Sequence, residues 1–246
     1  MYPSDVTANP LKRRLFGAMS DWADVVRLDP AEAHPALWRF DLDCLHVARY
    51  APPALADMRR AELAGVRTVN ATAGARLACD RLARSRLLRA HDVRVPRFEF
   101  GTDDAVSLDP PVVVKRRFEY TERDHVHRYV RSGPVAYDGE RLVESLVGAE
   151  TSYKCYRVGE AVRTVTPSSG REVSATDPPS GVESLARAVG DLFGLTCCEV
   201  DLLAVEVGRP YVVDVNPAVS LRGVPDGRAV YESHLRREAR RAVEGE

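Results

Sequence analysis

The chain has 246 residues, of which 45% are hydrophobic and 29% charged, and its formal net charge is -1. This composition is ordinary for a soluble globular protein, and the balanced charge leaves no basic footprint for nucleic acid. No apolar run approaches the ~20 residues that a membrane-spanning helix needs, and the first residues lack the apolar core of a signal peptide. We therefore expect a cytoplasmic protein that binds neither membranes nor nucleic acid.

The first third of the chain alternates between strand and helix patterns. We expect strands over 24–30, 41–50 and 65–70, and helices over 54–63 and 73–91. Asn70 and Thr72 are candidate caps for the second of these helices. Strands that alternate with helices predict a small α/β lobe.

The remainder of the chain is richer in strands. Strands are expected over 93–100 and 110–120, and three short strands that follow one another, expected to be antiparallel, over 141–147, 151–159 and 161–167. A helix over 180–194 has Ser180 as its candidate N-cap and Gly194 beyond its end. A hairpin around Gly208 and a basic amphipathic helix over 227–246 complete the chain. This element pattern places lobe boundaries near residues 72 and 145.

The five cysteines include the adjacent pair Cys197 and Cys198 and show no Cys-x-x-Cys spacing. An odd number of cysteines with an adjacent pair is not a disulfide pattern. We expect reduced thiols.

The stretch "PYVVDVNPAVSLRG" ends an apolar strand on two oxygen-bearing side chains, Asp214 and Asn216. Side chains two apart in a strand lie on the same face, and the preceding strand carries Asp201. If the two strands pair around Gly208, Asp201 comes to lie opposite Asp214. Two carboxylates and an amide oxygen are hard ligands that suit Mg²⁺, whereas the simpler alternative is that they only end the strands.

Lysine is rare in this chain, which has only Lys12, Lys115 and Lys154 among its 35 basic residues. A bias toward arginine suggests that each remaining lysine lies where a compact ammonium group is needed. Lys115 ends the apolar run "PVVVK", and Lys154 lies in "TSYKCYRVG". Either side chain could simply extend to solvent, but we favour phosphate binding for both.

Several segments between about residues 65 and 225 resemble the ATP-grasp enzymes, which clamp MgATP between two α+β lobes behind a small α/β lobe. "GVRTVNATAGARLACDRLARSRLLRAHDVRVPR" is similar to the segment that enters the first clamping lobe, and "VVVK" to a strand that ends on a phosphate-contacting lysine. "RLVESLV" resembles the hinge between the lobes. The resemblance implies an α/β lobe over 1–72 and α+β lobes over 73–145 and 146–246.

The resemblance also implies roles for individual residues. Arg81, at the position of a family lysine, and Lys115 would hold the phosphates of ATP, together with Lys154. Asp201, Asp214 and Asn216 fall on the magnesium triad, which would bind Mg²⁺ or, in its place, Mn²⁺. The hinge would bind adenine through the backbone of Glu144, Ser145, Leu146 and Val147.

Two departures from the family pattern concern the phosphates and the acceptor. The segment 116–132 contains no glycine, although the family usually has a glycine-rich flap there. Side chains could replace its backbone amides, namely those of Arg116, Arg117, His125 and His127. After Asn216 many members have Pro-Gly, where this chain has Val219 and Ser220, so the acceptor does not carry over.

Two subfamilies compete. "GVRTVN" and "VRVP" look like the ligases that join a carboxylate to an amine, but these typically carry Asp-x-Arg where this chain has Ser152, Tyr153 and Lys154. The lysine instead resembles the inositol trisphosphate kinases. These kinases are also similar at Arg81, Asp214, His125 and the pair Pro167 and Ser168.

We favour an ADP-forming ligase, because a multiply phosphorylated acceptor needs a dense cationic pocket that the basic residues Lys12, Arg13 and Arg14 do not by themselves supply. The γ-phosphoryl group of ATP would pass to a carboxylate, and an amine would capture the acyl phosphate. The partners would be a small acid and amine, or the tail of a peptide or carrier protein. The alternatives are an inositol-phosphate-type kinase and a non-catalytic ATP-binding protein, which the missing glycines would favour.

Overall fold

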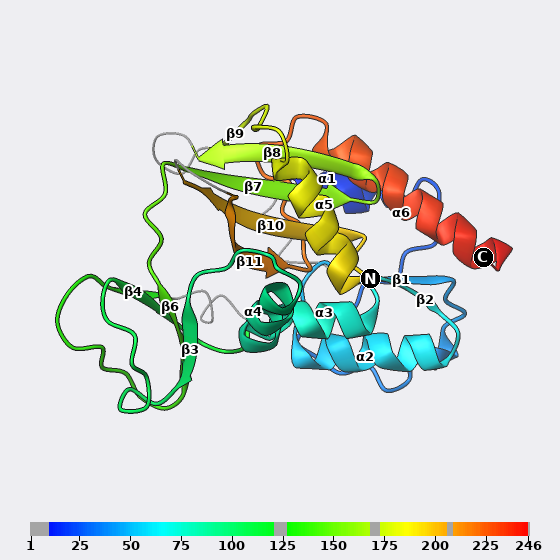
Figure 1. Cartoon of the computed structure of the whole chain (residues 1–246). Coiled ribbons are helices and arrows are strands. Elements are labelled where there is room, and N and C mark those ends of the chain that lie inside the picture. Colours follow the sequence, from blue (N-terminus) through cyan, green and yellow to red (C-terminus); the bar gives the residue numbers. More distant parts are fainter. Residues whose placement is uncertain (1–9, 121–126, 168–172, 206–208, 246) are drawn as a thin grey trace.

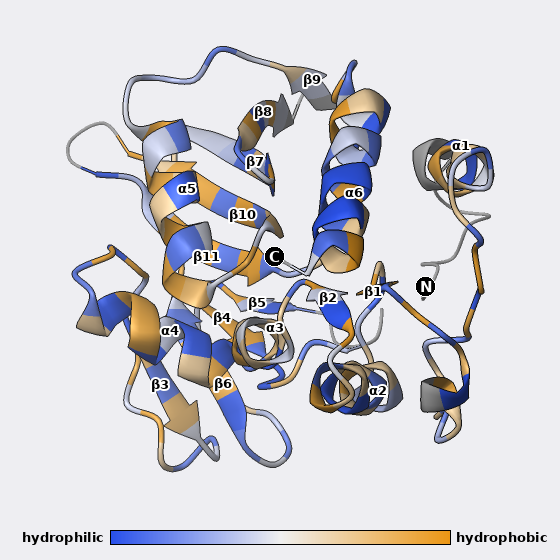
Figure 2. Ribbon diagram, turned by 90° about the vertical axis from the view of Figure 1, so that its right-hand side faces the viewer, coloured by the Kyte–Doolittle hydropathy of each residue, from blue (hydrophilic) through white to orange (hydrophobic). Residues whose placement is uncertain are grey.

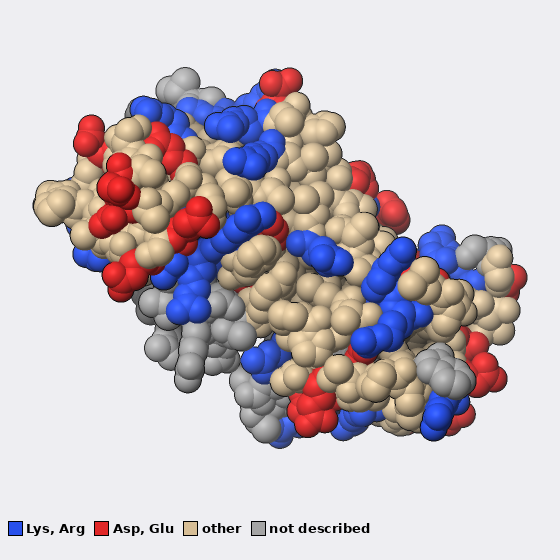
Figure 3. Space-filling view, turned by 90° about the horizontal axis from the view of Figure 1, so that it is seen from below, with Lys and Arg blue, Asp and Glu red and all other residues tan. Residues whose placement is uncertain are grey.

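The computed structural model describes residues 10–120, 127–167, 173–205 and 209–245, and it contains three β-sheets (Figure 1). The described helices include none that is long and apolar enough to cross a membrane. Seen from below, the surface carries basic side chains over much of its length, with acidic side chains grouped at the left end and others toward the right end (Figure 3).

The N-terminal part is built around a two-stranded parallel sheet. Its strands pair with Leu45 opposite Thr68. The expected strand over 24–30 is wrong, because this segment pairs with no described strand and instead buries Leu28 in the apolar cluster beneath the second helix. In chain order the elements are α1 (Pro10–Met19), the 3-10 helix η1 (Leu37–Arg39), β1 (Cys44–His46), α2 (Pro52–Leu63) and β2 (Arg67–Val69).

The helix expected over 73–91 is divided in two at Asp80, into α3 (Thr72–Cys79) and α4 (Arg81–Ala90). The Asp80 side chain caps α4 by accepting hydrogen bonds from the amides of Leu82 and Ala83, each at 3.1 Å. Aspartate is a strong N-cap residue because its short side chain reaches these free amides. The break turns the start of α4 toward the segment that follows the strand ending at Lys115, since the Arg81 amide donates to the Arg117 carbonyl at 2.8 Å.

Neither Asn70 nor Thr72 caps α3, contrary to expectation, since Ala71 holds the N-cap position and Thr72 is the first residue of the helix. The Asn70 side chain is buried and bonds to three segments of the chain. Its Nδ2 donates to the carbonyls of Cys197 at 2.7 Å and Pro217 at 2.9 Å, and its Oδ1 accepts from the Cys197 amide at 2.7 Å. Asn70 therefore ties the N-terminal part to the two strands that carry the predicted metal ligands.

A four-stranded antiparallel sheet forms the second part, in the order β3-β6-β4-β5. Its strands are β3 (Phe98–Gly101), β4 (Val112–Lys115), β5 (Arg128–Val130) and β6 (Arg141–Ser145). Valines from the three strands β4, β5 and β6 form a small core. Of the three successive strands expected after residue 140, the first lies in this sheet, antiparallel to β3 and β4, and the other two pair with each other in the next sheet.

A five-stranded antiparallel sheet forms the third part, in the order β11-β10-β7-β8-β9. Its strands are β7 (Thr151–Val158), β8 (Ala161–Pro167), β9 (Val173–Ala175), β10 (Cys197–Ala204) and β11 (Tyr211–Asn216). The predicted pairing of the last two strands is confirmed, whereas Gly208 lies outside the described residues. The predicted N-cap Ser180 is not the cap of α5 (Val182–Phe193), because Gly181 holds that position.

The two faces of the five-stranded sheet are covered differently. Helix α5 packs on one face against apolar side chains that include Val200 and Val215. Helix α6 (Gly227–Glu244) lies on the other side of the sheet and, with α1, shares a core with Tyr156 and Val158 (Figure 2). Part of this second face lies beyond α6 and carries the charged side chains of β7, β10 and β11, which are described next.

Candidate active site

The predicted metal ligands lie together at the edge of the five-stranded sheet. Asp201 on β10 is directly opposite Asp214 on β11. Two residues along each strand, Glu199 is opposite Asn216. Opposed residues of an antiparallel pair share a face, so all four side chains leave the sheet on the same side. A bulge places Val213 as the extra residue beside this pair, and bulges re-aim the side chains next to them.

Asp214 is held by Arg84, whose guanidinium lies 2.5 Å from the carboxylate. Arg84 is buried and also donates to the carbonyls of Val215 at 3.1 Å and Ala78 at 3.3 Å. Burial alone would raise the pKa of Asp214, but the nearby cations Arg84, Lys115 and Arg81 hold it well below its usual range. Asp214 is therefore an anion at any physiological pH.

Asp201 is in a less favourable electrostatic position than Asp214. Its carboxylate lies 2.8 Å from Lys154 Nζ, which also contacts Glu199. Burial, together with the charges of Glu199 and Asp214, raises the pKa of Asp201 to about 7 despite the lysine. The positive charge of Lys154 is thus too little to stabilise the ionised carboxylate of Asp201 fully.

These residues fit a magnesium ion by the chemistry of their donors. Mg²⁺ is usually held by one or two carboxylates together with waters and phosphate oxygens, and an additional cation would stabilise the charged form of Asp201. Among the residues that the structure describes, no three His, Cys, Asp or Glu side chains are grouped for a metal. The amide oxygen of Asn216, which accepts a hydrogen bond from the Ala218 amide at 2.9 Å, would have to be the third ligand.

Lys115 ends β4 and points toward β11. Its Nζ contacts the carboxylate of Glu144 on the neighbouring strand β6 and lies 3.5 Å from the Val213 carbonyl. Both side chains are largely buried. Lys115 therefore joins the four-stranded sheet to β11, which carries two of the predicted metal ligands, and its charge is balanced by Glu144.

Arg81 is fully buried, with an exposed fraction of 0%. Its guanidinium lies 3.0 Å from Glu119 and donates to the Arg116 carbonyl at 3.0 Å. Arg84, one helical turn later, lies 3.6 Å from the same Glu119 carboxylate. The two arginines thus share Glu119, and Arg84 also reaches the predicted metal ligand Asp214.

The glycine-free segment 116–132 contains two histidines. The structure describes His127, whereas His125 lies outside the described residues. The Nε2 atom of His127 lies 3.4 Å from the Arg81 guanidinium. Burial and the cations Lys115 and Arg81 lower the pKa of His127 to about 4. Of the other two predicted replacements for the glycine flap, Arg117 is paired with Asp80 at 2.7 Å, and Arg116 contributes its carbonyl to Arg81.

The predicted hinge is divided between two environments. Ser145, Leu146 and Val147 line an open hollow of about 510 Å³ together with Arg94 and Tyr211. This volume is within the range of small-molecule sites, ~300–1,000 Å³. Glu144 contributes its side chain to Lys115 instead, and the Leu146 amide donates to the Pro111 carbonyl at 2.8 Å.

Three residues of this region were missed by the sequence analysis: Arg84, Glu119 and Glu199. Arg84 could have been found, because it follows Arg81 by three residues and so shares its helix face. Glu199 could also have been found, because it precedes Asp201 by two residues in the same strand. No local signal marks Glu119, which reaches the arginines only through the helix break at Asp80.

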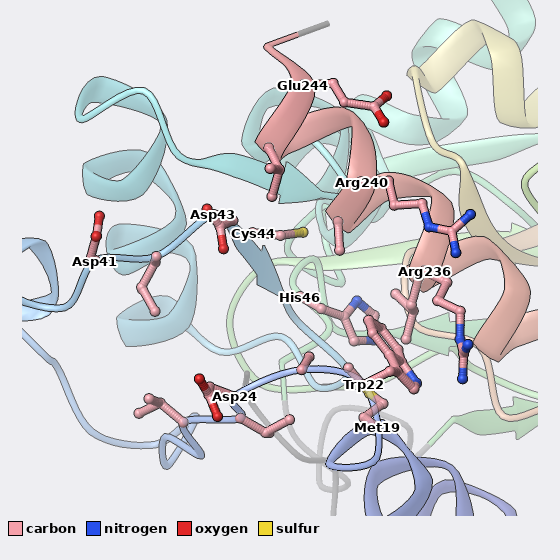
Figure 4. Close-up of a pocket in the computed structure, with 17 residues that line it drawn as sticks. Met19, Trp22, Asp24, Asp41, Asp43, Cys44, His46, Arg236, Arg240 and Glu244 are labelled. Atoms are coloured by element: carbon pink, nitrogen blue, oxygen red, sulfur yellow. The ribbon is translucent and has the colours of Figure 1, made fainter.

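A second hollow, of about 470 Å³, lies between α1, β1 and α6 (Figure 4). Arg236 stacks on the ring of Trp22 there at 5.0 Å, and Cys44 and His46 extend from β1. Asp24, Asp41 and Asp43 line it on one side, and Arg236 and Arg240 of α6 line it on the other. None of the residues predicted to bind MgATP is among those that line it.

The sequence matches no protein-family model and no curated protein sequence. Solved structures do match. D-alanine--D-alanine ligase from Bacillus anthracis has a TM-score of 0.75 at 13% identity and covers 100% of this chain and 97% of its own. A RimK domain ATP-grasp protein from Sphaerobacter thermophilus DSM 20745 has a TM-score of 0.73 at 21% identity, with 91% and 94% covered. The ATP-grasp ligase PsnB, complexed with minimal precursor, Mg and ADP, has a TM-score of 0.67 at 13% identity, with 98% and 97% covered.

Proposed function

This chain has the ATP-grasp fold, and from that premise we propose that it is an ADP-forming ligase that activates a carboxylate with MgATP and joins it to an amine. The observation that carries the proposal is the facing pair Asp201 and Asp214 with Asn216 beside it, on the sheet face toward which Lys115 and Lys154 extend. Ligases of this fold have been solved with ATP and with Mg and ADP, which supports the same cofactors here.

The expected reaction begins with transfer of the γ-phosphoryl group. A carboxylate oxygen attacks the γ-phosphorus, the bond to the ADP oxygen breaks, and an acyl phosphate forms. An amine then attacks the acyl carbon, and inorganic phosphate leaves. Phosphoryl transfer needs positioning and charge stabilisation more than a nucleophilic side chain, so a site made of cations and metal ligands is chemically sufficient.

Each predicted residue has a definite part in this reaction. Lys115 and Lys154 would neutralise the phosphate oxygens from the two sheets, and Asp201, Asp214 and Asn216 would hold Mg²⁺, which when bound stabilises the charge on the transferred phosphate. The backbone of the hinge residues 145–147 would bind adenine in the hollow that they line. Arg81 is paired with Glu119 in this structure and would reach a phosphate only by leaving that partner.

The experiment that tests the proposal follows the γ-phosphate by phosphorus NMR. The protein is incubated with MgATP and a pool of amino acids, other carboxylates and inositol phosphates. We expect ADP and free phosphate only when a carboxylate and an amine are both present. A phosphate monoester on an alcohol would instead identify a kinase, and ATP that binds without any transfer would identify a non-catalytic nucleotide-binding protein.

A further inference from the structure

Glu199 lies beside the metal ligands without being one of the predicted ligands. On β10 it is opposite Asn216 of β11 and Tyr156 of β7, so these three side chains form a row across the sheet next to the row of Asp214, Asp201 and Lys154. The Glu199 side chain is 12% exposed. A carboxylate thus lies one step along the sheet from the row that holds two predicted metal ligands and Lys154.

The segment that follows the metal-ligand strand holds Glu199 in place. Ser220 donates to its carboxylate from both the hydroxyl, at 3.1 Å, and the amide, at 3.4 Å. The Ser220 hydroxyl also lies 2.9 Å from the Tyr156 hydroxyl, which donates to the Arg222 carbonyl at 3.4 Å. Glu199 is therefore positioned by a network, as a residue that binds a ligand has to be.

The backbone next to Ser220 is in an unusual conformation. Leu221 has a φ of 52° and is buried, and Gly223 has a φ of 77°. A left-handed conformation at a residue with a side chain costs on the order of 1 kcal/mol and persists only where its surroundings enforce it. The turn that aims Ser220 at Glu199 is therefore maintained against a local energetic cost.

The partner of Glu199 in this structure is an ammonium group, that of Lys154. Under the proposed function Lys154 turns to the γ-phosphate and Asp201 to the metal, which leaves the Glu199 carboxylate with the hydrogen bonds of Ser220 alone. A largely buried carboxylate without a counter-ion is unfavourable. A substrate ammonium group entering at this position would restore the pairing.

We propose that Glu199 is the amine subsite of this enzyme, where it binds the ammonium group of the second substrate beside the acyl phosphate. This inference rests on the proposed ligase function. The bound ammonium loses one proton to solvent, and the free amine attacks the acyl carbon. The bond from that carbon to the phosphate oxygen breaks, inorganic phosphate leaves, and the nitrogen releases its second proton as the amide forms. The substrate class is therefore a primary amine that is cationic at neutral pH, such as an amino acid.

The test compares two nucleophiles in the wild type and Glu199→Gln. Hydroxylamine, which is uncharged near neutral pH, traps acyl phosphates as hydroxamates without an ammonium site. In the hydroxylamine assay, the twenty amino acids serve as the carboxylate substrates. In a second assay, which detects amides by mass spectrometry, they serve as both the carboxylates and the cationic amines. Glu199→Asp is the conservative variant. Glu160→Gln, at an exposed glutamate of the β7–β8 turn, is the matched control for loss of one charge.

We expect Glu199→Gln to form hydroxamate at the wild-type rate, while the KM for the amine rises at least about tenfold and the KM for ATP stays unchanged. Glu199→Asp should recover part of the amine affinity, and Glu160→Gln should match the wild type. An unchanged amine KM in Glu199→Gln would overturn the assignment, as would loss of hydroxamate and amide together, because Glu199 would then serve the phosphoryl step. Wild-type protein that forms no hydroxamate with any carboxylate would instead contradict the proposed function itself.

Discussion

The half of the candidate active site around Lys115 lies inside the protein, whereas the half around Lys154 opens to solvent. Arg81, Arg84 and Lys115 are buried, and each is paired with a carboxylate. The side chains of Lys154 and Asp201 are 30% and 32% exposed. The first half is therefore part of the folded core, and the second is free to exchange one charged partner for another.

This difference in burial separates two roles of the charged side chains: those of the inner half stabilise the fold, and those of the outer half are placed to exchange partners. A buried cation that loses its carboxylate partner destabilises the fold, so the pairs of the inner half serve folding whether or not ATP binds. Arg81 is the clearest case, because Glu119 and the Arg116 carbonyl occupy its guanidinium. The outer half, in contrast, carries Lys154 and Asp201, whose contacts would have to change in the proposed reaction.

The largest effect is expected at the inner half, from Lys115→Ala. This substitution removes a proposed phosphate ligand and leaves Glu144 buried without its ion-pair partner, which should lower the free energy of unfolding by about 3–5 kcal/mol. Thermal unfolding and MgATP binding by calorimetry measure the two consequences. The double variant Lys115→Ala/Glu144→Gln should recover much of the stability but none of the binding, and recovery of both would remove Lys115 from the nucleotide site.

A smaller and more specific effect is expected for Asn216→Ala. It removes one predicted neutral ligand of the metal and should weaken MgATP binding by about 1.5–3 kcal/mol, roughly 10- to 150-fold. The affinity for ATP is measured once with Mg²⁺ and once with a chelator in place of Mg²⁺. The variant should lose affinity only when the metal is present. An equal loss in chelator would show that Asn216 acts on the nucleotide or the fold instead.

The inner half should also give a measurable dependence on pH through His127. Its pKa of about 4 in the folded protein lies below the unfolded value of about 6.5, so the unfolded chain binds a proton first as the pH falls. The contribution of His127 to stability is constant well above pH ~6.5 and decreases below it, by about 1 kcal/mol between pH ~7 and ~5.5, and it is read from the difference between the wild type and the His127 variant. Urea unfolding of the wild type and His127→Gln checks this expectation. The proton NMR signals of the His127 ring give the second readout: titration near pH ~6.5 would contradict the buried, cation-flanked position.

The smallest effect on turnover is expected at the adjacent cysteines. Cys197 and Cys198 are buried on opposite faces of the five-stranded sheet, and burial raises the pKa of Cys198 to about 12 and that of Cys197 further. Neither thiol is therefore a nucleophile at neutral pH. Replacing either by serine should leave turnover intact, apart from some loss of stability. Lost activity in a variant that remains folded would reveal a role for the thiol.

Much of the fold follows from local sequence patterns. The ATP-grasp fold expected from the resemblance is confirmed, and so is the antiparallel pairing that brings Asp201 opposite Asp214, because two alternating strands around a turn leave few other registers. The predicted lobe boundaries and the roles of the site residues remain predictions. The predicted strand over 24–30 was wrong because an apolar run buries its side chains equally well without a strand partner.

The contacts between segments could not be read from the sequence. Asp80 in the middle of a helical pattern was a visible cap signal, but its result, Glu119 placed against two arginines, depends on a segment almost forty residues away in the chain. The pairing of Lys154 with Glu199 likewise depends on which strand β7 joins in the sheet. Charge pairs of this kind follow from the tertiary fold and not from local pattern.

The three bonds of Asn70 have a consequence for protein engineering. Because one amide side chain fastens both ends of the metal-ligand hairpin to the N-terminal part, these two parts are not independent modules. A chimaera that takes its first seventy residues from another chain would have to supply an equivalent side chain at this joint. Without it, the Cys197 amide and the Pro217 carbonyl would lose their partner, and the contact between the transplanted lobe and the strands of the predicted metal ligands would be weakened.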